Sequence, residues 1–306
     1  MMIYHKWDMQ LSYLQQKYPW LKLHADKISE YIPPDYYNSI LKEYVFNSVT
    51  DLKLFSNYLD SKIRPLPIIR ALELGFGSGR ATDIFLEHIP RYTSLDMVDL
   101  SPQMIDYSQK KYRNQRGISF IRSDTINYFS SAKNKYDFVY SLWSFSHSVH
   151  QHLIHDPSKS EYVKNNILRF IKNNLESNGK LYIIHFDSQS EEQTILFKQW
   201  KKVFPIFSDI NIQSPSKLLI DEVSNICLRE GIGKMSTTHL VGDPIRYESM
   251  NEALETFMNF HMETYFNKSN DVEEIIDELK QDFNTYQKEN GIYIKPGCFI
   301  YEFEKR

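Results

Sequence analysis

The chain has 306 residues, 42% of them hydrophobic and 25% charged, which is a globular composition with enough length to bury a substantial core. It contains no apolar run of about twenty residues, which excludes an ordinary transmembrane helix, and its first residues lack the basic-then-apolar order of a signal peptide. A formal charge of -3 gives no basic surface for a phosphate backbone, so nucleic-acid substrates are disfavoured. The two cysteines, Cys227 and Cys298, are expected to be buried thiols in a reducing cytoplasm.

Residues 1–66 are expected to form an N-terminal helical cap. Short amphipathic stretches, such as residues 40–59, are interrupted by Pro19 and by the pair Pro33 and Pro34. Two further prolines at positions 65 and 67 close the segment. We therefore expect residues 67–306 to form the main domain.

Strands and helices then alternate, which predicts a mostly parallel sheet with helices on both faces, that is, an α/β fold. The clearest helix spans residues 159–176 and ends at Asn178 and Gly179. Helical insertions are expected near 189–230 and 248–291, with a sixth strand within 235–247. A final strand over 293–303 is interrupted by Pro296 and Gly297. The first five strands are expected at residues 68–74, 94–99, 118–122, 136–141 and 180–186.

A glycine-rich turn follows the first strand and reads Glu73-Leu74-Gly75-Phe76-Gly77-Ser78-Gly79-Arg80. Glycines in such a turn let the backbone adopt positive φ and approach a ligand, while the next helix presents free N–H groups. A dinucleotide fingerprint would need a third glycine where Arg80 stands, so an NAD-dependent oxidoreductase is disfavoured. A carboxylate at Glu73 suits the ammonium end of an amino acid better than a pyrophosphate, and S-adenosylmethionine fits that charge pattern.

The second and third predicted strands also end in acids. Asp99 is placed to accept both hydroxyls of a ribose, and Ser101 is expected to cap a helix that has Pro102 at its first position. Met104 is as well explained by core packing as by contact with an adenine. Asp124 either accepts the adenine amino group or caps the helix that begins at Thr125.

Residues 68–186 resemble the core of the Rossmann-like S-adenosylmethionine-dependent methyltransferases. The resemblance rests on the glycine turn, on residues 97–105, on Asp124, on residues 136–141 and on residues 178–181. It implies that Glu73, Gly75 and Gly77 hold the methionine part, Asp99 the ribose and Asp124 the adenine. The remaining residues expected to border the cofactor are Gly79, Leu100, Met104, Thr125, Ser141 and Leu142, the last two at the methyl end.

The same resemblance implies a seven-stranded sheet whose last strand runs antiparallel between the fifth and the sixth. The long segment between the sixth and seventh strands departs from the simplest version of the family. In this family, additions such as residues 1–66, 189–230 and 248–291 commonly shape the pocket of the methyl acceptor.

A histidine-rich stretch, residues 141–155, follows the fourth strand and is expected to be a loop facing the transferable methyl group. His147 or His150 could remove the acceptor proton, because imidazole titrates near neutral pH. Trp143 and His185 are candidate substrate contacts. Zinc or iron binding is the competing hypothesis for the histidines, but no cysteine supports it, and we expect no metal.

These features predict methyl transfer from S-adenosylmethionine to an oxygen or nitrogen atom of a small metabolite by in-line displacement. A protein or RNA methyltransferase and a non-catalytic S-adenosylmethionine-binding module are the alternatives. We expect a small-molecule acceptor with no nucleic-acid or membrane partner, and leave a homodimer open.

Overall fold

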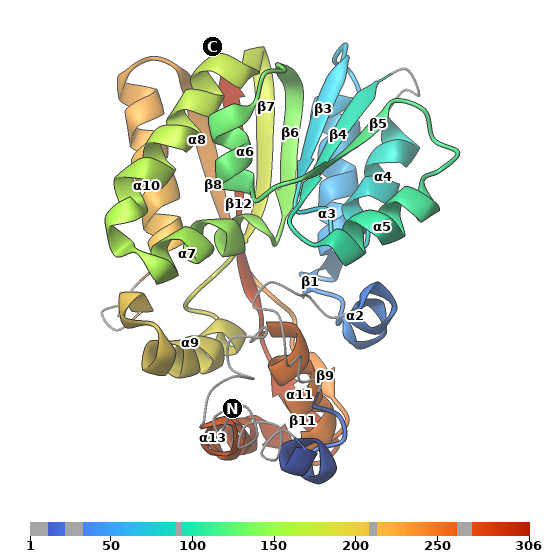
Figure 1. The fold of residues 1–306 in the computed structure, drawn as a ribbon, viewed down its shortest axis with the longest axis vertical. Helices are drawn as coiled ribbons and strands as arrows, with labels where there is room; N and C mark the ends of the chain where they lie inside the picture. The colour runs from blue at the N-terminus through green and yellow to red at the C-terminus, as the bar shows by residue number, and fades with distance from the viewer. Residues whose placement is uncertain (1–11, 22–32, 90–92, 208–212, 262–270) are drawn as a thin grey trace, which may run out of the picture. The chain divides into compact units, whose positions relative to one another are not determined.

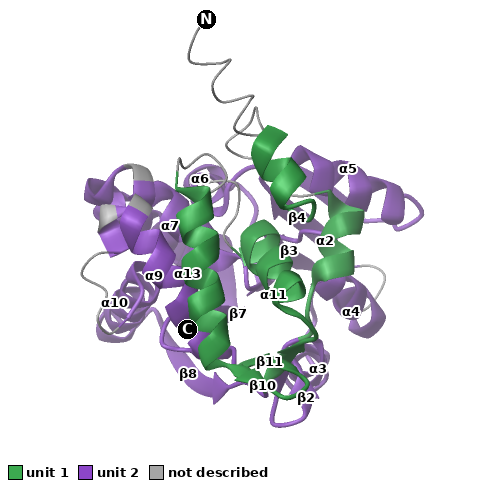
Figure 2. Ribbon diagram, turned by 90° about the horizontal axis from the view of Figure 1, so that it is seen from below, with its two compact units in different colours: residues 1–43, 244–294 green, residues 44–243, 295–306 purple. Residues whose placement is uncertain are grey.

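The computed structural model describes residues 12–21, 33–89, 93–207, 213–261 and 271–306. Parts of the expected cap and of both expected insertions lie outside these residues. The chain divides into two compact units, coloured separately in Figure 2. Unit 1 comprises residues 1–43 and 244–294, and unit 2 comprises residues 44–243 and 295–306.

Unit 2 contains a seven-stranded sheet in the order β5-β4-β3-β6-β7-β12-β8 (Figure 1). The strands from β5 to β7 are parallel, and β12 is antiparallel to both β7 and β8. The expected position of the last strand between the fifth and sixth is thus confirmed. The strands are β3 (Arg70–Leu74), β4 (Ser94–Asp99), β5 (Ile118–Arg122), β6 (Tyr136–Leu142), β7 (Leu175–Phe186), β8 (Gly233–Val241) and β12 (Gly297–Lys305).

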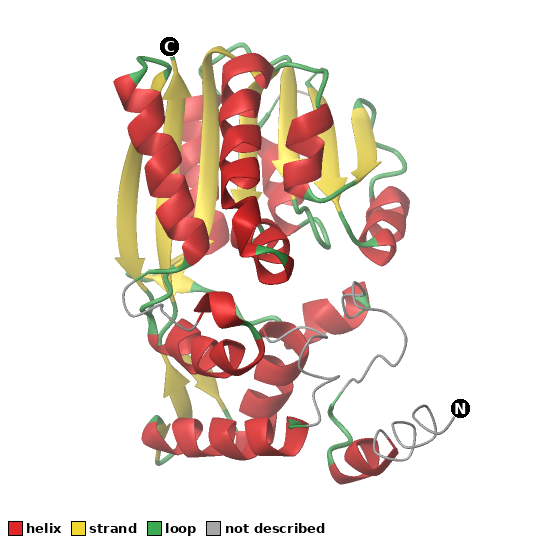
Figure 3. Cartoon of the chain, turned by 60° about the vertical axis from the view of Figure 1, so that its left-hand side comes forward, coloured by secondary structure: helices red, strands yellow, loops and turns green. Residues whose placement is uncertain are grey.

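Helices pack on both faces of this sheet, as Figure 3 shows, because successive side chains of each strand point to opposite faces. On one face, Val139 of β6 belongs to a buried cluster that also contains residues of α6, α8 and α10. On the other, Phe138 and Tyr140 stack on rings from α3 and α4. The helices are α3 (Asp51–Tyr58), α4 (Arg80–His88), α5 (Pro102–Lys111), α6 (Thr125–Ser131), α8 (Ser160–Asn174) and α10 (Pro215–Arg229).

The helix expected at 159–176 is shorter, and the strand after it is longer, than the sequence predicts. Residues 175–179 belong to β7, where Leu175 pairs with Tyr136 and a register shift follows before Phe138. Asn178, with a φ of 63°, lies in that irregular part of the strand instead of ending the helix. Pairing with β6 therefore overrides the local helical pattern.

The helix expected within residues 40–59 is wrong in part. Val45–Phe46 (β1) and Val49–Thr50 (β2) pair as a hairpin, and the turn residues Asn47 and Ser48 have φ values of 52° and 64°. Such positive values suit the tight turns of two-residue hairpins. A π-helical turn, η1 (Leu59–Ile63), follows α3.

The division between the units lies at residue 43, whereas the sequence analysis places a boundary at 66. The reason is that α3 packs on α4 and inserts Phe55 against β6, which makes residues 44–66 part of unit 2. That the N-terminal segment acts as a cap stays a prediction.

The segment 189–230, expected as an insertion, contains α9 (Glu191–Val203), the short helix η3 (Pro205–Phe207) and α10. Of these, α10 lies beside α8 and β8 and covers the sheet. The helix α7 (Phe145–His155) and the short helix η2 (Pro157–Lys159) connect β6 to α8.

Unit 1 has its own three-stranded antiparallel sheet in the order β10-β11-β9. The expected sixth strand is two strands, β8 in the large sheet and β9 in the small one. The expected last strand is likewise divided into β11 of the small sheet and β12 of the large one. Among the described residues, no helix is both long and apolar enough to cross a membrane. The elements are α2 (Pro34–Ile40), β9 (Ile245–Tyr247), α11 (Met250–Thr256), the π-helical η4 (Phe257–His261), α13 (Val272–Thr285), β10 (Gln287–Lys288) and β11 (Gly291–Ile294).

Candidate active site

The glycine turn joins β3 to α4 and has the backbone that the sequence predicts. Gly75, Gly77 and Gly79 have φ values of 67°, 53° and 83°, a region that side chains disfavour. A Cβ atom on Gly75 would lie 1.6 Å from Oγ of Ser144, so the close approach of the segment after β6 requires a glycine there. A Cβ on Gly77 would meet no atom within 4 Å.

Asp99 at the end of β4 is hydrogen-bonded to the glycine turn. Its Oδ2 accepts from the backbone N–H of Gly77 at 2.9 Å, and its Oδ1 accepts from the N–H of Ser101 at 2.9 Å. Burial raises its pKa, and the backbone hydrogen bonds oppose that rise. Ser101 caps α5 by accepting from the N–H of Met104, as expected, and Met104 is buried. The carboxylate therefore lies where the turn and the tip of β4 meet.

Glu73 of β3 is a buried carboxyl group with neutral hydrogen-bond donors. Thr82 donates to its Oε2 at 2.6 Å and Tyr140 donates to the same oxygen at 2.9 Å. Its pKa is raised to about 8, mainly by burial. The two hydrogen bonds oppose this rise, and the negative charges of Asp83 and Asp99 contribute to it. Burial therefore favours the protonated form near neutral pH.

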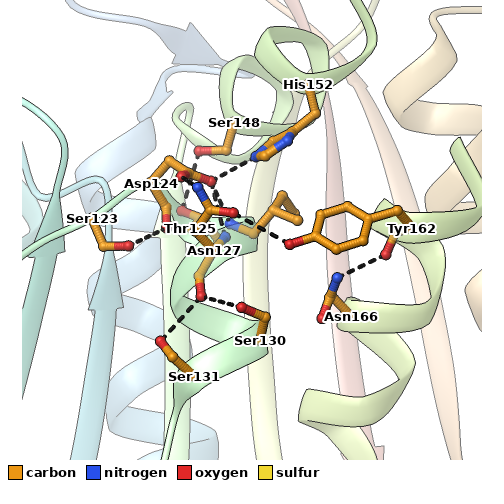
Figure 4. Close-up of polar contacts among 11 residues, drawn as sticks. Ser123, Asp124, Thr125, Asn127, Ser130, Ser131, Ser148, His152, Tyr162 and Asn166 are labelled. Carbon is orange, nitrogen blue, oxygen red and sulfur yellow. Dashed lines mark hydrogen bonds and ion pairs between the residues drawn. The ribbon is translucent and has the colours of Figure 1, made fainter. Parts of the chain in front are cut away.

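Asp124 has several partners, which Figure 4 shows. It caps α6 by accepting from the N–H groups of Ile126 and Asn127 at 3.0 Å, so the capping alternative is confirmed. Nε2 of His152 lies 2.8 Å from its Oδ1. Burial would raise the pKa of Asp124, but the hydrogen bonds from His152 and the backbone outweigh it and lower the pKa. Thr125 is buried and accepts from Ser148 at 3.1 Å.

The end of β6 carries the residues expected near the methyl group. Ser141 is fully buried and donates to the carbonyl of Leu74 at 2.9 Å, so its hydroxyl group connects β6 to β3. Leu142 is half-buried. Trp143 has a φ of 68°, and its Nε1 donates to Oδ2 of the buried Asp51 at 2.8 Å.

An aromatic cluster surrounds Phe186 at the end of β7. The ring centroids of Trp143, His147 and Tyr44 lie 4.8, 5.8 and 6.3 Å from that of Phe186. Tyr44 also donates to the buried Glu192 at 3.0 Å, and burial raises the pKa of Glu192 to about 7. The sequence analysis did not identify Tyr44, Phe186 or Glu192 as site residues. In the structure, the predicted residues Trp143 and His147 both contact Phe186.

The histidine-rich stretch is a helix and not the expected loop, because residues 145–155 form α7. His147 and His150 are three residues apart and so lie on neighbouring positions of one helix face. His150 is buried, and its Nε2 has no hydrogen-bond partner. Burial lowers the pKa of His150 well below its usual range, and the neighbouring His147 and His185 lower it further.

His185 of β7 is hydrogen-bonded on both ring nitrogens. Its Nδ1 lies 2.7 Å from the carbonyl of Phe186, which can only accept, and its Nε2 lies 2.9 Å from the hydroxyl of Ser216. Burial lowers its pKa to about 4, so the imidazole is neutral. The described residues contain no group of three or more histidine, cysteine or acidic side chains that could hold a metal ion.

Part of the chain matches a known domain family. Residues 71–159 match the model of the methyltransferase domain. Malonyl-[acyl-carrier protein] O-methyltransferase 1 of Ilyobacter polytropus is 31% identical over 74 residues, which are 24% of this chain and 26% of that protein. The chain thus matches about a quarter of that curated relative's length. The YcgJ protein of Bacillus subtilis superposes with a TM-score of 0.50 at 11% identity, over 83% of this chain and 97% of that chain, and supports the Rossmann-like fold.

Proposed function

We propose, from the premise that residues 71–159 form a methyltransferase domain of the Rossmann-like S-adenosylmethionine-dependent family, that this chain methylates a small metabolite. The observation that carries the proposal is the junction at Asp99. Its carboxylate is bonded to the N–H of Gly77 in the glycine turn and lies at the tip of the strand beside β3. An acid that can accept the ribose hydroxyls thus lies beside a glycine turn whose backbone a ligand can approach, which is the arrangement that binds nucleosides in Rossmann-like folds.

The charges of the site suit a cationic cofactor. Glu73 and Asp99 are both buried acids, and the charge of Asp99 contributes to the raised pKa of Glu73. The positive ammonium and sulfonium groups of S-adenosylmethionine would favour the ionised form of both carboxyl groups. We propose that Glu73, Gly75, Gly77 and Gly79 hold the methionine part.

Other proposed cofactor contacts follow the strand ends. Asp99 and Leu100 would bind the ribose. Oδ2 of Asp124 accepts from the side chain of Asn127, and its Oδ1 is hydrogen-bonded to His152 (Figure 4). We propose that the adenine amino group donates to this carboxylate. The further members of the proposed set are Met104, Thr125, Ser141 and Leu142.

When bound, the cofactor supplies an electrophilic methyl group on sulfur. The acceptor atom would use a lone pair to form the new bond to that methyl carbon, while the carbon–sulfur electron pair stays on sulfur. We propose His147 as the group that takes the acceptor proton. It lies in the first turn of α7, directly after the β6 end, and its ring contacts Phe186 beside Trp143. Trp143 and His185 are the proposed contacts to the acceptor.

We propose an acceptor of metabolite size, with no nucleic-acid or membrane partner, for a chain with a formal charge of -3. A homodimer is compatible with this proposal. The free thiols Cys227 and Cys298 agree with a reducing cytoplasm, which is the proposed location.

The test supplies purified protein with S-adenosylmethionine carrying a radiolabelled methyl group, together with a cell extract separated by size. We expect the label in the small-molecule fraction and about a 100-fold lower rate for His147→Gln, since a general base contributes at least that factor. The variant His239→Gln, on β8, serves as the control and should keep the rate. Label in protein or RNA would contradict a small acceptor, and no label in any fraction would contradict catalysis.

A further inference from the structure

His150 lies among aromatic rings outside the proposed cofactor contacts. Its ring centroid is 5.2 Å from that of Phe207 in η3 and 6.4 Å from that of Phe197 in α9, and both contacts are edge-on. Trp200 of α9 continues the aromatic surface, 5.4 Å from Phe207. The imidazole thus places a polar ring nitrogen among the rings of Phe197 and Phe207.

The Nε2 atom of His150 is buried and has no hydrogen-bond partner, and the residue as a whole is only 8% exposed. Leaving a buried polar atom unpaired is unfavourable, and such atoms in native proteins call for a specific explanation. A ligand group that hydrogen-bonds to Nε2 would supply one.

The buried, apolar surroundings of His150 select the kind of group that can bind there. Burial lowers the pKa of His150, and His147 and His185 lower it further, so these surroundings disfavour a positive charge on the imidazole. An ammonium group placed there would likewise lose its hydration, which is unfavourable without a carboxylate to pair with it. A hydroxyl group is uncharged, and because it both donates and accepts, it can pair with Nε2 in either neutral tautomer of the imidazole.

We infer that His150 binds a hydroxyl group of an aromatic acceptor through Nε2, with Phe197 and Phe207 contacting the ring that carries it. This inference rests on the proposed function, and it narrows the acceptor to a phenol-like molecule. Because burial keeps the imidazole neutral, His150 acts by a hydrogen bond and not by taking the proton. It is therefore a residue that determines which acceptor binds.

The test compares three probes of similar size, phenol, toluene and benzylamine, by nitrogen-15 NMR titration of the histidine side chains in protein loaded with S-adenosylhomocysteine. We expect phenol to bind about tenfold more tightly than toluene and to shift the Nε2 resonance of His150. Benzylamine, a cation, should bind more weakly than toluene. Equal binding of phenol and toluene, or a His150 resonance that phenol does not shift, would overturn the inference.

The same binding preference is then measured on variants of the protein. His150→Phe keeps an aromatic ring but removes Nε2, so phenol should lose its tenfold advantage while toluene binds as before. His239→Gln should keep the wild-type preference. The wild-type titration decides the question if His150→Phe fails to fold. Failure to bind S-adenosylhomocysteine would contradict the proposed function, whereas normal binding of it without preference for phenol would contradict only this inference.

Discussion

Replacing Glu73 by Gln should change how the stability of the protein depends on pH. The carboxyl group accepts from Thr82 and Tyr140, and the amide oxygen of Gln can accept the same two hydrogen bonds. The substitution therefore keeps the size and the hydrogen bonds of the side chain and removes only its ionisation.

The expected size follows from the pKa of Glu73, which burial raises from 4.5 to about 8. Between these values the folded protein keeps the proton that the unfolded chain has released, so stability falls as pH rises. At about 1.4 kcal/mol per pH unit, wild type should lose about 5 kcal/mol between pH 4.5 and pH 8 through this one group. Above pH 8 both states are ionised and the loss ends.

Urea unfolding of wild type and Glu73→Gln at each pH unit from 5 to 9 measures the effect, because the difference between the two proteins isolates this group. We expect the free energy of unfolding of the variant minus that of wild type to increase by about 1.4 kcal/mol for each pH unit up to 8. A difference that stays constant over this range would show that Glu73 is ionised throughout, and would refute the reasoning.

Two further substitutions test the packing around the site by urea unfolding. Gly75→Ala places a Cβ 1.6 Å from Oγ of Ser144 at a φ of 67° and should cost about 3 kcal/mol, whereas Gly77→Ala, with open space and a φ of 53°, should cost about 1 kcal/mol. Equal costs would contradict the close approach. Trp143→Phe removes the donor to Asp51 and should cost about 2 kcal/mol, since a buried carboxylate loses a partner; a loss below about 0.5 kcal/mol would contradict that contact.

The large sheet could be predicted from the sequence because its strands are local apolar runs. Buried parallel strands are hydrophobic on both faces, and glycine or proline marks their ends. The cap of α5 was equally readable, since Ser101 and Pro102 are a local signal. The position of β12 followed from the resemblance to a family, not from the residues themselves.

The rest of the site depends on contacts between distant parts of the chain. The β1–β2 hairpin is fixed by the turn at Asn47 and Ser48 and by the stacking of Phe46 with Trp143, and no local periodicity shows this. The pairing of Asp124 with His152 could be seen only once residues 145–155 are helical. One signal was available: neither proline nor glycine occurs between Trp143 and Asp156, which favours a helix over a loop.

Calorimetric titration with S-adenosylmethionine tests the central claim most directly, on wild type, on Asp99→Ala and on Asp106→Ala, an exposed acid of α5 that serves as the control. The account predicts micromolar binding to wild type and to Asp106→Ala, and at least tenfold weaker binding to Asp99→Ala, because hydrogen bonds to a charged group are lost. NAD should not bind. Binding of NAD, or equal binding of S-adenosylmethionine to all three proteins, would contradict the site at the tip of β4.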